Sequence, residues 1–228
     1  MNGKEEEADL LYNAYLTMTT IAAIKNKHTN EIVVCHDGRI STTQGEIISE
    51  NAKKIIVFNH FALLWCGSEH LKDLVSFKYR DLFNSLTIAD EEDVLWFYQI
   101  YFDNVLNDTT VKATEKDGQS RHTADYIIIT PDNIYEINTF GELWGSDLRQ
   151  KRYDGDIRLA VAGSGWTVCQ HFIEWYLENT AITEFSNEQM ASILKLGAEY
   201  TGKRMSSCNS NITLYKVTDL FQTNTWNT

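Results

Sequence analysis

Strand-like and helix-like segments follow one another in a simple order along this chain of 228 residues. Short runs rich in β-branched residues, such as 32–34 and 55–58, predict buried strands. Longer runs with apolar residues at helical spacing predict amphipathic helices. The order is strands, two helices, strands, two helices and a last strand. It predicts an α+β fold in which two antiparallel sheets pack face to face between outer helix layers, a four-layer αββα sandwich.

Helix ends and turns divide the chain further. Ser186 begins a helix as its N-cap, and Gln189 stands at the matching position of a capping box. Pro131-Asp132-Asn133 forms the turn of a hairpin. We expect strands at 19–26, 31–36, 55–58, 61–66, 126–130, 134–137, 157–162 and 211–217, helices at 69–83, at 90–106, from Ser164 or Thr167 to about 178 and at 186–203, and a polar loop at 109–123.

One domain accounts for most of the chain. Residues 1–18 are acidic and are interpreted as a leader or propeptide, 19–220 as the domain, and 221–228 as a tail. The run Glu5-Glu6-Glu7 has the wrong sign for a secretory signal. Cys35, Cys66, Cys169 and Cys208 are widely spaced, which favours reduced thiols and a cytoplasmic protein.

Charge and hydropathy exclude some kinds of partner. The formal net charge is −12, which argues against a nucleic-acid surface. No run of about 18 apolar residues is present, so we expect no membrane span. The histidines lack the short spacings of a zinc site, and Gly163-Ser164-Gly165 lacks the third glycine of a dinucleotide loop. We therefore expect neither a metal nor a cofactor.

Thr19 is the first residue of the first expected strand. A threonine in that place means little unless the chain is cut just before it. The freed α-amino group titrates near pH ~8 and is partly a neutral base at physiological pH. It then lies beside the hydroxyl and can accept its proton, which is a known way to activate threonine as a nucleophile.

An ordered set of short motifs accompanies Thr19. With these motifs, over about residues 19–217, the chain resembles the proteasome β-subunits and HslV-type peptidases, and it is closer to the HslV type. The resemblance implies the N-terminal-nucleophile hydrolase fold. The motifs are Thr19-Thr20-Ile21, Val34-Cys35-His36-Asp37-Gly38-Arg39, Gly45, Asn51-Ala52-Lys53-Lys54-Ile55, Cys66-Gly67, Ala160-Val161-Ala162-Gly163-Ser164-Gly165 and Leu177-Glu178-Asn179-Thr180.

The resemblance assigns roles to five residues. Thr19 matches the nucleophile, Asp37 the acidic residue that orients the site, and Lys54 the lysine that lowers the proton affinity around the hydroxyl. Gly45 matches the glycine whose backbone N–H binds the oxyanion, a contribution of about 3 kcal/mol per donor. Ser164 matches the serine near the terminal amine. Without the resemblance, Asp37 would be interpreted as a turn residue and Lys54 as part of a solvated face. His36 is interpreted as a packed or hydrogen-bonded residue.

Two features depart from the family pattern. Relatives carry an Asp late in the chain, but the corresponding stretch 201–208 holds serines and no acid. A self-cleaving leader usually ends in Gly, whereas Met18 precedes Thr19 here. HslV-type chains begin Met-Thr-Thr, so we expect translation to start at Met18 or the leader to be removed later.

The resemblance implies a threonine-type endopeptidase, made as a zymogen and assembled into a ring, that hydrolyses unfolded polypeptides. An ATP-driven unfoldase is implied as a partner. One alternative is a catalytically silent ring subunit that keeps its leader. Another is an amidohydrolase of the same fold that acts on a small amide.

Overall fold

The computed structural model describes residues 19–41, 46–114, 122–138, 147–148, 151–152, 157–180 and 186–222. Two five-stranded antiparallel sheets and a small separate hairpin account for its strands. The expected leader 1–18 and most of the expected tail lie outside the described residues. The strands are β1 (Ile21–Asn26), β2 (Glu31–Asp37), β3 (Ile40–Ser41), β4 (Ile47–Ser49), β5 (Ile55–Val57), β6 (Ala62–Gly67), β7 (Ala124–Ile129), β8 (Ile134–Asn138), β9 (Asp147–Leu148), β10 (Lys151–Arg152), β11 (Ile157–Ala162) and β12 (Ile212–Lys216).

The first sheet has the strand order β10-β11-β1-β2-β12. β1 lies at its centre, where Ile21 is opposite Ala162 of β11 on one side and His36 of β2 on the other. The pairing of Ile212 with Asp37 brings β12 to the outer side of β2. The start of β1 is thus held between strands from both halves of the chain.

The second sheet has the order β5-β6-β7-β8-β9. The expected hairpins 55–66 and 126–137 are both present, and β6 joins them by pairing Leu64 with Ile127 of β7. The two-stranded β3-β4 hairpin stands apart from both sheets.

Period-two alternation gives each central strand two buried faces. In β1, Ile21 and Ala23 pack between the two sheets, whereas Ala22 and Ile24 pack under the helices. Residues of β2, β6 and β7 alternate in the same way. Burial of each large aliphatic side chain contributes about 1.5–3 kcal/mol, and burial on both faces is possible only with helices outside both sheets.

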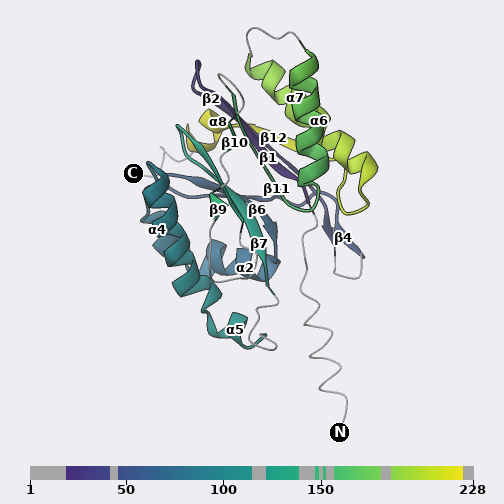
Figure 1. Cartoon of the computed structure of the whole chain (residues 1–228). Helices are drawn as coiled ribbons and strands as arrows, with labels where there is room; N and C mark the ends of the chain where they lie inside the picture. Colours follow the sequence, from purple (N-terminus) through teal and green to yellow (C-terminus); the bar gives the residue numbers. More distant parts are fainter. Residues whose placement is uncertain are drawn as a thin grey trace.

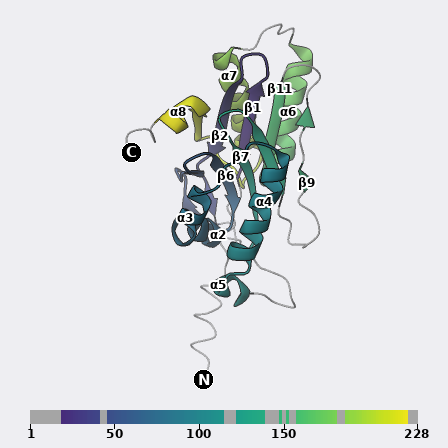
Figure 2. The same ribbon diagram turned by 90° about the vertical axis from the view of Figure 1, so that its left-hand side faces the viewer.

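Helices cover both outer faces (Figure 1). α6 and α7 pack on the first sheet, and α2, α4 and α5 lie on the opposite side of the molecule with the second sheet. Figure 2 shows α4 running alongside β7. The four-layer αββα prediction is confirmed. The helical segments are α2 (Glu69–Asp73), η1 (Leu74–Lys78), α3 (Arg80–Asn84), α4 (Glu91–Tyr101), η2 (Phe102–Leu106), α5 (Thr109–Lys112), α6 (Trp166–Asn179), α7 (Asn187–Arg204) and α8 (Val217–Gln222), with η denoting a π-helical turn.

The single helix expected at 69–83 is wrong. The chain forms α2, a π-helical turn and α3, and Tyr79 leaves helical geometry with φ −108° and ψ 14°. This break lets the Tyr79 hydroxyl donate to Asp108 Oδ2 at 2.7 Å, and Lys78 contacts the same carboxylate. Asp108 belongs to a distant segment, so no local sequence pattern could predict that the helix is interrupted at Tyr79.

Other boundaries differ in smaller ways. The loop expected at 109–123 begins with α5, whose N-cap Asp108 accepts a hydrogen bond from the Thr110 N–H at 2.9 Å. α6 begins at Trp166, between the two starting points expected for it. The capping box of Ser186 and Gln189 at the start of α7 is present as predicted. α8 was not expected. In the part of the chain that the structure describes, no helix has the length and apolar character needed to cross a membrane.

Candidate active site

Thr19 is fully buried and lies two residues before Ile21, the first residue of β1. Its carbonyl oxygen accepts hydrogen bonds from the Gly165 N–H at 3.2 Å and from Ser164 Oγ at 3.4 Å. The next carbonyl, that of Thr20, accepts the Asp37 N–H at 3.1 Å. Contacts from both halves of the chain therefore fix the main chain at Thr19 and Thr20.

Asp37 and Lys54 reach Thr19 from different sheets. Asp37 ends β2, whose antiparallel pairing with β1 places it beside Thr19 and Thr20. Lys54 directly precedes β5 in the second sheet, and its backbone carbonyl accepts the Trp65 N–H at 2.8 Å. The site therefore lies where the ends of the two sheets meet.

The three side chains make one hydrogen-bonded cluster. Lys54 Nζ donates to Asp37 Oδ1 at 2.8 Å and also to Thr19 Oγ1 and to the Arg39 carbonyl. The Thr19 hydroxyl donates to the same Asp37 Oδ1. The hydroxyl thus has the Lys54 amine on its lone-pair side and a carboxylate on its proton side, and the structure brings Thr19, Asp37 and Lys54 together.

Burial sets the electrostatics of this cluster. The side chains of Lys54 and Asp37 are each only 1% exposed. Desolvation lowers the pKa of Lys54, and the Asp37 carboxylate opposes that shift by attraction and by hydrogen bonding. A lysine held charged at this position stabilises negative charge on the Thr19 oxygen.

Ser164 contacts the other end of Thr19. Besides the Thr19 carbonyl, its Oγ lies 3.3 Å from Ser207 Oγ and 3.9 Å from Cys208 Sγ. Burial raises the pKa of the Cys208 thiol, so it is neutral near pH 7. Ser164 therefore has hydroxyl and thiol neighbours at the place where relatives are expected to supply a carboxylate.

Gly163 must be glycine for this turn to form. Its φ is +92°, and a Cβ atom there would stand 2.4 Å from the Thr19 carbonyl oxygen. The motif that the sequence analysis weighed as a weak dinucleotide loop is thus used for close approach to the backbone of Thr19.

Gly45, the expected oxyanion donor, lies outside the described residues. The β3-β4 hairpin flanks it on both sides in the sequence. Its role stays a prediction.

His36 has the packing role that the sequence analysis preferred. Its Nδ1 donates to the Asp37 carbonyl at 2.9 Å, and its Nε2 accepts the Lys54 N–H at 3.5 Å. Burial lowers the pKa of His36 to about 4. The neutral imidazole therefore joins the backbones that carry Asp37 and Lys54.

Sequence reasoning missed the contacts that surround Asp37 from the loop after α7. The Asn209 N–H donates to Asp37 Oδ2 at 3.3 Å, and its side chain reaches Gly38 and Glu50. These residues are far apart in sequence and match no motif, so no signal pointed to them. Among the described residues, no cluster of three potential ligands could hold a metal ion.

Comparisons of the whole structure identify its architecture. HslV from Trypanosoma brucei superposes with a TM-score of 0.58 at 13% sequence identity, and the match covers 87% of this chain and 98% of that one. The chain has the fold of HslV. BPH from Thiobacillus denitrificans matches with a TM-score of 0.65 at 13% identity, covering 87% of this chain and 97% of that one.

A second structure of BPH, in complex with epoxomicin, matches with a TM-score of 0.61 at 14% identity and covers 87% of this chain and 98% of that one. No protein-family model and no curated protein matches the sequence. At these identities the likeness establishes the fold, and chemistry has to be argued from the site.

Proposed function

We propose that the chain is a threonine-type endopeptidase subunit of a proteasome-like ring and that it hydrolyses unfolded polypeptides. The observation that carries this proposal is the buried cluster in which Thr19 Oγ1 contacts both Asp37 and Lys54. A buried lysine–carboxylate pair is costly to desolvate. Its placement around a threonine hydroxyl at the start of a central strand suits nucleophilic catalysis.

The mechanism needs Thr19 as the first residue. Its free amine accepts the hydroxyl proton as Thr19 Oγ1 attacks a substrate carbonyl, and Lys54 stabilises the developing charge on the oxygen. The Gly45 N–H would stabilise the tetrahedral oxyanion. The leaving amine takes the proton, which leaves a substrate ester on Thr19. Water, deprotonated by the same amine, then hydrolyses the ester and restores the hydroxyl.

Release of Thr19 is therefore part of the proposal. Translation starting at Met18 followed by removal of that methionine, or later cleavage of residues 1–18, would expose the amine. The intact mass of protein from its native source tests this step. A mass lacking residues 1–18 supports the proposal, and a single species that retains Met1 contradicts it.

Ring assembly and the partner rest on the HslV-like fold. Ring confinement would keep the site away from folded proteins in the cytoplasm, and an ATP-driven unfoldase would supply extended chains. Such chains would bind as strands along a sheet edge. Light scattering would show the ring as a mass many times that of one chain.

Hydrolysis of a fluorogenic peptide panel tests the chemistry. Thr19→Ala should abolish turnover, and Thr19→Ser, which keeps a hydroxyl, should retain part of it. The exposed Thr218 on α8 provides a matched control, because Thr218→Ala removes a threonine hydroxyl that is not among the contacts of the cluster. BPH has been solved in complex with epoxomicin, so this compound is a suitable probe. A mass increase on the Thr19 peptide, absent in Thr19→Ala, would support the proposal.

A catalytically silent ring subunit is the second candidate. The surroundings of Ser164 favour it, because Ser164 contacts Ser207 and Cys208 where a carboxylate is expected in relatives. This reading predicts a retained leader, the same ring, no turnover and no epoxomicin adduct.

A further inference from the structure

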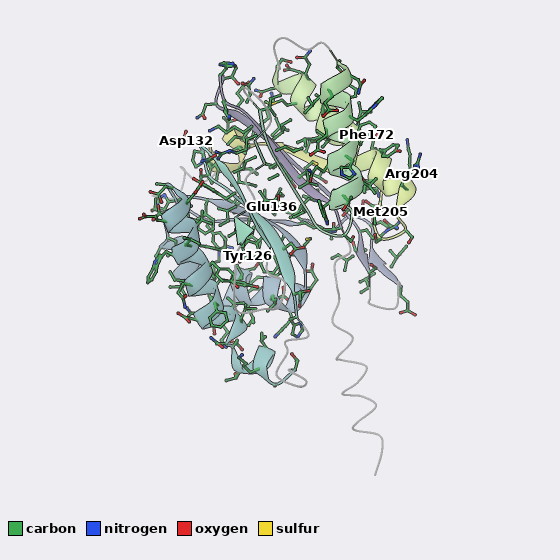
Figure 3. All side chains as sticks on the ribbon, viewed as in Figure 1. Tyr126, Asp132, Glu136, Phe172, Arg204 and Met205 are labelled. Carbon is green, nitrogen blue, oxygen red and sulfur yellow. The ribbon has the colours of Figure 1, made fainter. Side chains whose placement is uncertain are left out.

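The loop at residues 206–211 connects α7 to β12 and lies against the end of β2. It begins after Met205, the C-cap of α7, on the side of the molecule that carries β4 (Figure 3). Asn209 is 5% exposed, although Ser206 and Ser210 in the same loop are exposed. A buried asparagine in a short connecting loop requires partners for its carboxamide.

Every polar group of the Asn209 side chain has such a partner. Oδ1 accepts the Gly38 N–H and the Asn211 N–H, each at 3.2 Å. Nδ2 donates to the Glu50 carbonyl at 2.9 Å and to the Glu50 carboxylate. The backbone N–H of the same residue donates to Asp37 Oδ2 at 3.3 Å.

We propose that Asn209 is a positioning residue that orients the Asp37 carboxylate for Thr19 and Lys54. This inference rests on the proposed function. Thr19 and Lys54 both use Oδ1 of Asp37, and the Asn209 N–H holds the other oxygen. Rotation of the carboxylate would break the hydrogen bonds at Oδ1 and the one at Oδ2, so the bonds at the two oxygens together fix the plane of the carboxylate.

The carboxamide is needed because it closes a ring of contacts. Arg39 pairs with the Glu50 carboxylate at 2.9 Å, and the Arg39 carbonyl accepts Lys54 Nζ. The contacts thus run from Asp37 through Asn209, Glu50, Arg39 and Lys54 back to Asp37. Only a short amide supplies an acceptor for Gly38 and a donor for Glu50 at once. Aspartate would place a second carboxylate beside Glu50, and alanine would remove both contacts.

Peptide hydrolysis by the isolated protein tests the proposal with three variants. Asn209→Ala should lower kcat by about 10- to 100-fold and change KM by less than about twofold, because misplaced reacting groups affect the chemical step. Asn211→Ala is the matched control, since the exposed Asn211 also donates to the Glu50 carbonyl but does so at 3.3 Å and without touching Asp37. It should keep wild-type kcat.

The pH profile separates positioning from structural damage. Asp37, His36, Cys66 and Cys208 are titratable groups that face Lys54, and among them Asp37 is the main one that keeps it protonated. In Asn209→Ala the alkaline limb of kcat should move to lower pH, a change that a smaller amount of folded enzyme would not cause. If Asn209→Ala does not fold, Asn209→Asp replaces it, and adding Glu50→Gln should recover part of its loss.

A crystal structure of Asn209→Ala provides a readout that does not depend on activity. The proposal expects the Asp37 carboxylate to turn away from Thr19 or Lys54. An unmoved carboxylate together with wild-type kcat and pH profile would overturn the positioning role. A wild-type protein that cleaves no peptide would contradict the proposed function. The orientation of the Asp37 carboxylate in the crystal structure of Asn209→Ala would still test the positioning role.

Discussion

Replacing Asp37 by Asn should expose how strongly the buried cluster depends on charge compensation. The substitution keeps the shape of the side chain but leaves the Lys54 ammonium without its carboxylate at 1% exposure. Two unit charges 2.8 Å apart attract by about 6 kcal/mol at an effective dielectric constant of about 20. Partial loss of the carboxylate's own desolvation cost offsets this, so we expect a net destabilisation of about 3–5 kcal/mol near pH 7.

The loss of unfolding free energy in Asp37→Asn should depend on pH, and its sign can be worked out. Burial already lowers the pKa of Lys54 in the native state, and removal of Asp37 lowers it further. Above its folded pKa the native state binds fewer protons than the unfolded chain, so stability rises with pH there. The variant enters this regime at lower pH than the wild type. The destabilisation is therefore largest where both proteins hold charged Lys54, and it shrinks as pH rises toward the pKa of free lysine.

Urea unfolding of both proteins at a series of pH values from 6 to 10 measures the effect. Glu199→Gln is the matched control, since it removes a carboxylate 3.8 Å from Lys195 on the surface of α7. It should cost less than about 0.5 kcal/mol at every pH. A deficit in Asp37→Asn that stays constant across this range, or one no larger than that of the control, would refute the reasoning.

Three further changes test other parts of the structure. Gly163→Ala should destabilise by about 2 kcal/mol or more, because φ is +92° and the new Cβ meets the Thr19 carbonyl oxygen at 2.4 Å; an unchanged thermal midpoint would contradict this. Ser186→Ala removes the side-chain half of the α7 capping box and should cost about 1 kcal/mol in denaturant unfolding, with no effect expected from the exposed Ser210→Ala. His36 is buried neutral with a pKa of about 4, so stability should fall by about 3 kcal/mol as pH drops from 6.5 to 4, when the unfolded chain binds the proton first. His36→Gln should remove that part of the acid slope and leave the part due to His122, whose pKa burial also lowers to about 4; an unchanged slope would show that His36 is not responsible.

The layers of the fold could be predicted because their signals are local. Segments such as Ile21–Ile24 and Ala62–Cys66 are short, continuous apolar runs, which predict strands buried on both faces, and the structure buries both faces of each. The capping box at Ser186 is equally local. The broken helix at 69–83 could not be predicted, because Tyr79 leaves the helix to contact Asp108, a residue outside any local window.

The residues of the candidate site also fall into two groups, those that sequence motifs could predict and those that depend on contacts between distant segments. Thr19, Asp37 and Lys54 came from a resemblance that is carried by ordered motifs, and the structure brings all three together. Asn209 and His36 act through contacts between segments, and their residue types alone suggest nothing more than a turn and a packed ring. A single sequence holds no record of which distant backbone groups they meet.

The central place of β1 also has a kinetic consequence. β1 is hydrogen-bonded on both sides, and its partner β11 comes from the other half of the chain. Such distant pairing makes folding slow relative to helical proteins of similar length. Once formed, the strand can open only when much of the sheet opens with it. The amides of Ile21 to Ile24 should therefore exchange with deuterium among the slowest in the molecule, and the residue that follows any removed leader would be anchored in its most persistent part.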